Sequence, residues 1–254
     1  MKIFRGFDDL PRFDGGVATL GSFDGVHCGH MALLNEVLRR AHEKGVQSVV
    51  YTFEPHPRIT LNRAEGLRLL STAAEKASLL EAAGVDNLIY MPFTEAFSRL
   101  SPDEFISQCL VRYGVGTLVV GYNHRFGHDK QGDYEYLSSA GRPLWPEVVE
   151  VGQYLVGEGR VSSTIIRNLV AAGDMERAVQ LLGHAYLVAG HADGDGYVKP
   201  EEPEYKLLPP AGKYAAEVDG CRCEVLVDGD GRLRIEGCGK RDDILYINIG
   251  IRVC

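Results

Sequence analysis

Short apolar runs alternate with amphipathic helical patterns from Val17 to Gly183, and this rhythm constrains the fold more than any other feature. The apolar run at 17–20 predicts a first strand. Apolar residues recur at helical spacing over 31–44, which predicts a helix, and the Val- and Tyr-rich run at 47–53 predicts a second strand. Strands separated by helices in this way predict a mostly parallel sheet that helices cover on both faces.

The alternation continues beyond the second predicted strand. The TAAE pattern at 72–75 is typical of a capping box and predicts a helix that ends near Gly84. The SPDE pattern at 101–104 predicts another capped helix, with proline at its first position. Apolar runs at 87–92 and 117–121 predict two further strands. The fold class that we expect is therefore α/β.

The pattern changes after Tyr186. The segment 192–203 is rich in Gly, Asp, Glu and Pro and predicts a linker or long loop. Beyond it, short strand-like runs separated by DG and DGDG turns lie at 213–218, 222–227, 232–235 and 244–249. We therefore expect one domain over residues 1–186 and a small antiparallel β domain over residues 187–254.

The segment GSFDGVHCGH at 21–30 lies where the first predicted strand passes to the first predicted helix. In an open α/β sheet, ligands bind outside the carboxyl ends of the strands. Glycines let the backbone approach a phosphate closely, and a helix start supplies N–H donors with a partial positive charge. His27 and His30 can donate hydrogen bonds to phosphate oxygens. We interpret the segment as a phosphate-binding loop; the alternative is a glycine-rich turn with two surface histidines.

The segment VSSTIIR at 161–167 predicts a second helix start. One hydroxyl suffices to cap a helix, whereas Ser162, Ser163 and Thr164 offer three, with Arg167 about one turn along. Ser-Thr caps are common, so the segment alone is most simply a cap. Beside the phosphate-binding loop, it predicts a second phosphate-binding helix start.

Two further polar loops follow predicted strands. In the segment GYNHRFGHDKQG at 121–132, Asn123 can coordinate Mg²⁺ or bond a phosphate, Arg125 can clamp a phosphate, and Phe126 can pack against a planar ring. In the segment EPHPR at 54–58, the prolines stiffen a loop that carries His56 and Arg58. Either loop could instead be an ordinary polar surface.

These segments together resemble the bacterial FAD synthetase family. The resemblance rests on TLGSFDGVHCGH at 19–30, YTFEPHP at 51–57, the 121–132 loop and VSSTIIR at 161–167, in this order, and covers roughly residues 1–186. It implies a Rossmann-like nucleotidylyltransferase that joins AMP from ATP to FMN with Mg²⁺, giving FAD and pyrophosphate. The catalytic residues that it implies or that the motifs suggest are His27, His30, Ser163, Thr164 and Arg167. The binding residues are Gly21, Ser22, Phe23, Asp24, Gly29, His56, Arg58, Asn123, Arg125, Phe126 and Ser162, with Asn123 also the expected Mg²⁺ ligand.

The chain departs from the family in two places. Many members have Asp-Phe where this chain has Asn123-His124, and Arg in place of Lys130, so we expect altered detail rather than lost activity. Many members also continue into a riboflavin kinase barrel marked by a Gly-x-Pro-Thr-Ala-Asn motif. Residues 187–254 lack that motif, although GKYAAE at 212–217 resembles one of its strands. We interpret the tail as a shortened, degenerate relative without kinase activity.

Composition narrows the alternatives. The net charge of −8 argues against a general nucleic-acid binder. No membrane span or signal peptide is predicted, so we expect a cytoplasmic protein. The six cysteines match no common zinc module and are expected to be free thiols.

Three interpretations compete with FMN adenylylation: another acceptor such as pantetheine phosphate or nicotinamide mononucleotide, a bifunctional enzyme with kinase activity, and an inactive flavin or nucleotide sensor. The sequence does not indicate an oligomeric state.

Overall fold

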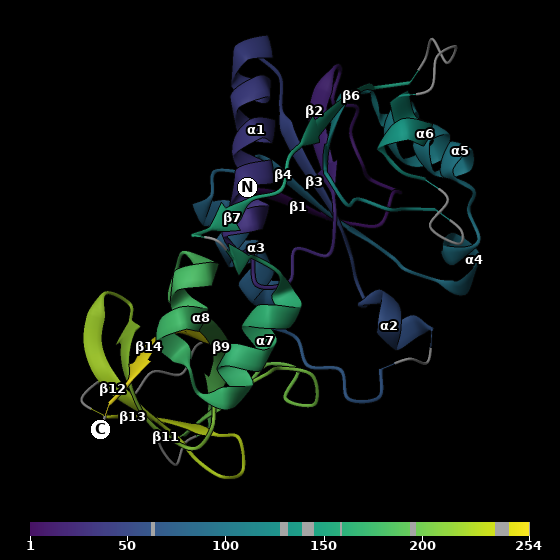
Figure 1. Ribbon diagram of the computed structural model, residues 1–254. Helices are drawn as coiled ribbons and strands as arrows, with labels where there is room; N and C mark the ends of the chain where they lie inside the picture. The colour runs from purple at the N-terminus through teal and green to yellow at the C-terminus, as the bar shows by residue number, and fades with distance from the viewer. Residues whose placement is uncertain are drawn as a thin grey trace. The chain divides into compact units, whose positions relative to one another are not determined.

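The computed structural model describes residues 1–61, 64–127, 132–138, 145–157, 159–193, 197–236 and 244–253 (Figure 1). The chain forms two compact units. The first unit consists of Met1–Phe23, Gly29–Glu65 and Leu80–Tyr154. The second unit consists of Asp24–Cys28, Gly66–Leu79 and Leu155–Cys254.

A six-stranded sheet organises the first unit, with strand order β1-β4-β3-β2-β5-β6. Every neighbouring pair in it is parallel. The strands are β1 Lys2–Arg5, β2 Gly16–Leu20, β3 Ser48–Phe53, β4 Asn87–Met91, β5 Val115–Gly121 and β6 Glu147–Val151. The central strands β2 and β4 are buried along their whole length, as expected of parallel strands that are covered on both faces.

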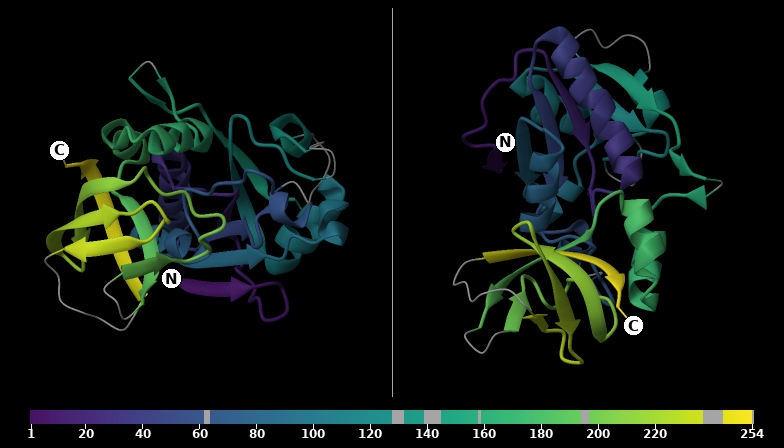
Figure 2. Two further views of the ribbon diagram at one scale, coloured as in Figure 1. Left: turned by 90° about the horizontal axis from the view of Figure 1, so that it is seen from below. Right: turned by 90° about the vertical axis from the view of Figure 1, so that its left-hand side faces the viewer.

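The helices of this part of the chain are α1 Cys28–Lys44, α2 Pro57–Thr60, α3 Ala73–Ala82, α4 Glu95–Ser98, α5 Pro102–Phe105 and α6 Tyr134–Ser138, with short helical turns η1 Ile106–Leu110 and η2 Val111–Tyr113. Figures 1 and 2 show α1 on one face of the sheet and the α4–α6 region on the other. The buried side of α1 presents Leu33, Leu34, Val37 and Ala41. Both predicted capping boxes form, at Thr72/Glu75 and Ser101/Glu104.

Among the described residues, the second unit contains the first part of α3, two further helices and a closed barrel of strand order β10-β13-β12-β11-β14-β9. Its elements are the hairpin β7 Leu155–Val156 and β8 Gly159–Arg160, helices α7 Ser163–Ala172 and α8 Met175–Leu182, and strands β9 Tyr186–Ala192, β10 Tyr197–Pro200, β11 Gly212–Val218, β12 Cys221–Val227, β13 Leu233–Glu236 and β14 Ile244–Arg252. Each pair in the barrel is antiparallel, and Figure 2 shows the strands curving round to close it. Gly173 and Gly183 end the two helices in the left-handed conformation.

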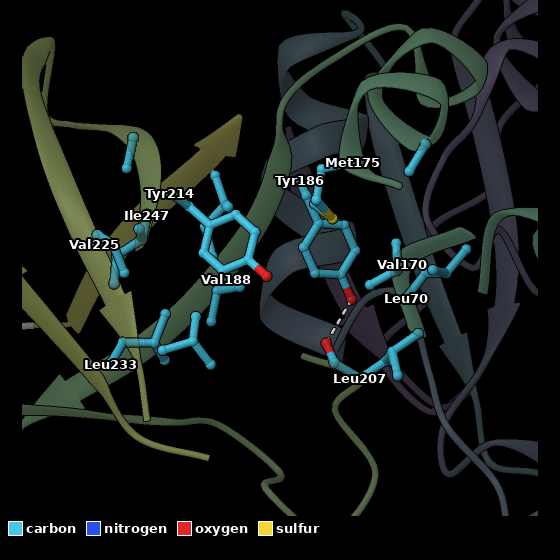
Figure 3. Close-up of a cluster of buried hydrophobic side chains, with 14 of the residues drawn as sticks. Leu70, Val170, Met175, Tyr186, Val188, Leu207, Tyr214, Val225, Leu233 and Ile247 are labelled. Atoms are coloured by element: carbon cyan, nitrogen blue, oxygen red, sulfur yellow. Dashed lines mark hydrogen bonds between the residues drawn. The ribbon is translucent and has the colours of Figure 1, made fainter. Parts of the chain in front are cut away.

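One apolar cluster joins the barrel interior to α7 and α8. It includes Tyr186, Val188, Tyr214, Val225 and Ile247, which are at most 1% exposed. Figure 3 shows these side chains with the Tyr186 hydroxyl donating to the carbonyl of Leu207, a hydrogen bond of 2.6 Å. Because the barrel and the two helices share this core, they form one packed body.

The structure confirms the α/β class, the parallel sheet and the antiparallel β tail. The interpretation of 192–203 as a linker was wrong in part, because Tyr197–Pro200 forms strand β10 and pairs with β9 and β13. Its proline ends the strand, where a missing N–H costs the ladder little. No helix within the described residues is long and apolar enough to cross a membrane.

Candidate active site

The loop that follows β2 has a backbone conformation that few residues adopt readily. Phe23 and Val26 have φ angles of 47° and 39°, in the left-handed region that is uncommon for non-glycine residues. Gly25 has a φ of 79°, and a Cβ there would lie 2.9 Å from the side chain of Leu70. The loop is therefore tightly folded, and a larger residue at Gly25 would strain it.

Asp24 fixes this loop within the second unit and is only 2% exposed. Its Oδ1 accepts hydrogen bonds from the backbone N–H groups of Leu70 at 2.9 Å and Ser71 at 3.0 Å. Its Oδ2 forms an ion pair with Nη2 of Arg167 at 3.0 Å, and its carbonyl accepts from the Ser163 hydroxyl at 3.0 Å. Asp24 thus connects the loop to the start of α7, so the structure brings two distant sequence motifs together.

The start of α7 combines a cap with an arginine that retains donor capacity. The Ser162 side chain accepts from the N–H of Ile165 at 3.3 Å and caps the helix as predicted. Thr164 is exposed, and its hydroxyl lies 3.5 Å from Nη1 of Arg167. Nε of Arg167 is buried and has no hydrogen-bond partner among the described residues. A buried N–H without a partner is costly, and an anionic ligand would satisfy it.

His27 precedes α1 and is 6% exposed. Burial lowers its pKa to about 4, against opposing effects of its own backbone and of Asp24, while His184 and Arg167 add to the lowering. The imidazole is therefore neutral at pH 7. A neutral imidazole carries no charge, so the positive charge beside this loop comes from Arg167.

His184 was not indicated by any sequence motif. It follows the end of α8, with Nε2 lying 3.0 Å from the carbonyl of Gly25 and Nδ1 lying 2.8 Å from the carbonyl of Ala185. The first contact joins the end of α8 to the loop that carries His27. A lone histidine after a helix is an ordinary pattern, so only the fold reveals this contact.

His30 lies in the first turn of α1, and Gly29 precedes it. Its ring packs against the fully buried ring of Phe23, with centroids 5.1 Å apart. Gly21 adjoins the same ring, since a Cβ there would lie 3.2 Å from it, and the Ser22 carbonyl accepts from Thr52 at 3.2 Å. These contacts belong to the first unit and hold the imidazole of His30 against the beginning of the loop.

His56 precedes the short helix α2 after β3, and Arg58 lies within that helix. Nδ1 of His56 accepts from the backbone N–H of Arg58 at 3.2 Å and so caps this helix. The Arg58 guanidinium donates to the carbonyl of Glu65 at 3.3 Å. Both residues make local contacts that stiffen the loop.

The loop after β5 places its three predicted site residues differently. Asn123 is exposed, Arg125 forms an ion pair with Asp133 at 2.7 Å, and Phe126 is 7% exposed. The Phe126 ring packs against Phe105 at 5.5 Å and stacks on His124 at 5.6 Å, so it belongs to the core of the first unit. Residues 128–131, including Lys130, lie outside the described residues.

Aromatic rings gather near this loop in a way the motifs do not indicate. Phe53 ends β3, and its ring lies 5.2 Å from Phe93 and 6.2 Å from Phe97. Phe97 lies 6.0 Å from Phe105, which continues the cluster to Phe126. Phenylalanines scattered over strand ends and a short helix are expected core residues, so sequence spacing could not reveal their convergence.

In the first unit, the loops after β3, β2 and β5 leave one edge of the sheet, because these adjacent strands are parallel. From β2 the chain proceeds to β3 and β4 on one side and to β5 and β6 on the other. The order of strands thus reverses between β2 and β5, which is where open α/β sheets bind ligands.

The described residues contain no group of three or more His, Cys, Asp or Glu side chains that could hold a metal ion. Cys28, Cys109, Cys221 and Cys223 are free thiols, as predicted, while Cys238 and Cys254 lie outside the described residues. In proteins, Mg²⁺ is commonly held by one or two side-chain oxygens, with substrate phosphates and water as its other ligands. The described side chains fit Mg²⁺ only in this way.

A model of the FAD synthetase family matches residues 11–165. The chain belongs to this family. A bifunctional riboflavin kinase/FMN adenylyltransferase of Listeria monocytogenes is 34% identical over 250 residues, covering 92% of this chain and 77% of that protein. The FAD synthetase of the same organism is 32% identical over 197 residues, covering 75% of this chain and 80% of that protein.

Two further proteins are similar to this FAD synthetase-family chain, one in sequence and one in fold. A bifunctional riboflavin kinase/FMN adenylyltransferase of Pseudomonas fluorescens is 40% identical over 193 residues, which cover 75% of this chain and 61% of that protein. The crystal structure of a macrolide-efflux protein from Streptococcus pneumoniae superposes with a TM-score of 0.82 over 100% of both chains. At 22% identity this likeness shows a shared fold alone.

Proposed function

We propose that this protein synthesises FAD by transferring AMP from ATP to FMN. An anionic phosphate oxygen of FMN attacks the α-phosphorus of ATP and forms the new P–O bond. The bond between the α-phosphorus and the bridging oxygen to the β-phosphate breaks, and pyrophosphate leaves. The attacking oxygen is already ionised at neutral pH, so the reaction needs charge neutralisation and alignment more than a general base.

Phosphate binding falls to the loop after β2 and to the start of α7. Arg167 supplies a positive charge with a buried Nε–H available, and Ser162 and Ser163 order the helix start behind it. His27, in the second unit, donates a hydrogen bond that strengthens as charge builds on the departing pyrophosphate. His30, in the first unit, stays a predicted phosphate donor. Asp24 orients Arg167 and does not contact a phosphate itself. Its carboxylate already binds Arg167 and the N–H of Leu70, and its negative charge would repel a phosphate.

The loop after β5 serves the flavin side. Asn123 is exposed at the end of a buried strand and offers an amide oxygen. Mg²⁺, when bound, neutralises phosphate charge and polarises the α-phosphate; Asn123 and the substrate phosphates would hold it. Phe126 contributes as a core residue that fixes the loop through Phe105.

One observation carries the proposal: the Asp24–Arg167 ion pair joins the loop residues Asp24–Cys28 to the Ser-Ser-Thr helix start within the second unit. Two segments separated by 143 positions thus form one anion-binding group. The family match supports FMN as the acceptor over pantetheine phosphate or nicotinamide mononucleotide.

The test is to incubate the protein with ATP and MgCl₂ and with each of the three acceptors, then to quantify product and pyrophosphate. We expect equal amounts of FAD and pyrophosphate with FMN and no product with the other two. Arg167→Ala should lower the rate more than tenfold, because hydrogen bonds to charged groups contribute about 1.5–3 kcal/mol. Arg177→Ala, which removes a guanidinium with a 71% exposed side chain on α8, is the matched control.

Binding of FMN and ATP without turnover would favour a sensor instead. Product with another acceptor would move the protein to a different nucleotidylyltransferase activity.

A further inference from the structure

Lys206 and Glu75 form a buried ion pair in the second unit, and neither residue belongs to a motif of the proposed reaction. Nζ of Lys206 lies 2.7 Å from Oε2 of Glu75, and both side chains are 0% exposed. The ammonium also donates to the carbonyls of Leu70 and Leu187 at 2.7 Å each. Its three N–H donors are therefore all used, as a buried ammonium requires.

The carboxylate of Glu75 has an equally complete set of partners. Its Oε1 accepts from the N–H of Ala189 in β9 at 2.7 Å, and its Oε2 accepts from the N–H of Thr72 at 2.8 Å. Glu75 thus acts both as the capping-box residue of α3 and as an anchor to the barrel. The sequence predicts the first role only, because the partner Lys206 lies 131 positions away.

The peptide group between Leu70 and Ser71 connects the Lys206–Glu75 ion pair to Asp24. Its carbonyl oxygen accepts from Lys206, and its N–H, which belongs to Ser71, donates to Oδ1 of Asp24 at 3.0 Å. In a trans peptide the C=O and N–H point in opposite directions, so fixing the oxygen aims the N–H. Binding the oxygen to a cation also polarises the N–H and strengthens its bond to the carboxylate.

Asp24 completes the connection to the substrate-binding group. Its second oxygen holds Arg167 at 3.0 Å, and its carbonyl holds the Ser163 hydroxyl at 3.0 Å. A continuous series of polar contacts therefore runs from the barrel, through Leu70–Ser71 and Asp24, to the start of α7.

We infer that Lys206 and Glu75 are positioning residues for ATP, which act through the Leu70–Ser71 peptide and Asp24 to aim Arg167. This rests on the proposed function, because ATP is the ligand that Arg167 is proposed to bind. The barrel is then a required support of the adenylyl-transfer reaction, and the absence of a kinase motif from residues 187–254 leaves this role intact.

The test separates positioning from simple stabilisation by measuring KM for each substrate and kcat. Lys206→Met removes the ammonium at similar length, and Glu75→Gln removes the charge while keeping an acceptor for Ala189. Each substitution should raise KM for ATP about tenfold, because a loss of this size corresponds to one charge-assisted hydrogen bond. Each should leave KM for FMN unchanged. Calorimetric titration with ATP should show the same loss of affinity without turnover.

The matched control is Val225→Ala, which opens a cavity in the barrel core at a fully buried residue outside the polar series (Figure 3). All proteins are compared at a temperature where each is folded. An unchanged KM for ATP in the Lys206 and Glu75 variants would overturn the inference. An equal increase in Val225→Ala would also overturn it, because general loss of stability would then suffice.

A measurement on the unaltered protein covers the case in which the variants do not fold. Coupling between two sites is reciprocal, so ATP with Mg²⁺ should slow amide exchange at Ala189, which donates to Glu75, more than at Val225. Equal slowing at both amides would contradict the inference. If the unaltered protein made no FAD at all, the proposed function would fail instead.

Discussion

Asp24 is almost fully buried, and each of its contacts joins segments that are distant in the sequence. The motif GSFDGVHCGH predicts a phosphate-binding loop, which stays a prediction, and the structure shows that the backbone of this loop is tightly folded. The sequence could not show that Asp24 turns inward to Leu70, Ser71 and Arg167. A polar residue in a glycine-rich loop can face either a ligand or the protein interior, and tertiary packing decides which.

We expect His30→Ala to lower kcat by more than tenfold while the protein remains folded. The side chain lies in the first turn of α1 and packs on Phe23, and one donor to a developing oxyanion is commonly worth about 3 kcal/mol. His42→Ala, an exposed position in the last turn of the same helix, is the control and should leave kcat unchanged. Full activity of a folded His30→Ala protein would remove His30 from the catalytic group.

Two histidines should make the fold sensitive to acid. Burial lowers the pKa of both His27 and His124 to about 4, whereas an unfolded histidine titrates near 6.5. Between these values the unfolded state binds more protons, so the free energy of unfolding falls as pH decreases from about 6.5 to about 4. Each histidine should cost about 2 kcal/mol of stability between pH 7 and pH 5.

The variant His124→Phe isolates one of these contributions. Phenylalanine keeps the stacking on Phe126 and cannot titrate. Urea unfolding at pH 7 and pH 5 should show that the variant loses about 2 kcal/mol less than the unaltered protein over this interval. Equal losses in the two proteins would show that His124 titrates normally.

Strands whose sequences are mostly apolar were predicted correctly. Residues 17–20, 47–53 and 87–92 are rich in apolar residues, and a strand of the parallel sheet forms at each of them. β10 was missed because its residues combine Tyr, Lys and Pro in a segment rich in turn formers. β1 and β6 were also missed, since Lys2–Arg5 and Glu147–Val151 are short sheet-edge strands with exposed polar positions.

The loop after β5 yields a prediction about the flavin side. Asn123→Ala should raise KM for FMN about tenfold and leave KM for ATP nearly unchanged, because the residue lies in the loop that the family resemblance assigns to flavin. Asn168→Ala, which removes an exposed amide from α7, is the control. Normal rates for Asn123→Ala at limiting FMN and limiting Mg²⁺ would show that the loop is only a surface feature.

At the scale of the whole molecule, the barrel was predicted as a small β domain, but its closure was not. Closure depends on β9 pairing with both β10 and β14, and residues of β9 were not recognised as a strand. The shared core with α7 and α8 was equally hidden, because long-range contacts carry no local signal. Residues of the barrel therefore support α7 as well as the barrel itself.

We expect no phosphorylation of riboflavin by this protein, although the bifunctional relatives carry that activity in their names. Residues 187–254 lack the Pro-Thr-Ala-Asn element expected to hold Mg²⁺ and the terminal phosphates of ATP. The measurement is chromatography of flavins after incubation with riboflavin, ATP and Mg²⁺. FMN formed at an enzymatic rate, and abolished by a Lys199→Ala or Glu201→Ala change at the end of β10, would contradict this expectation.

The central claim is that AMP passes from ATP to FMN, and isotopic labelling tests it most directly. ATP labelled in the α-phosphate should give FAD that carries the label, and ATP labelled in the γ-phosphate should give labelled pyrophosphate. Both products should appear at the same rate and require FMN and Mg²⁺. Label from the γ-phosphate in a flavin, or labelled inorganic phosphate with no labelled FAD, would contradict the account.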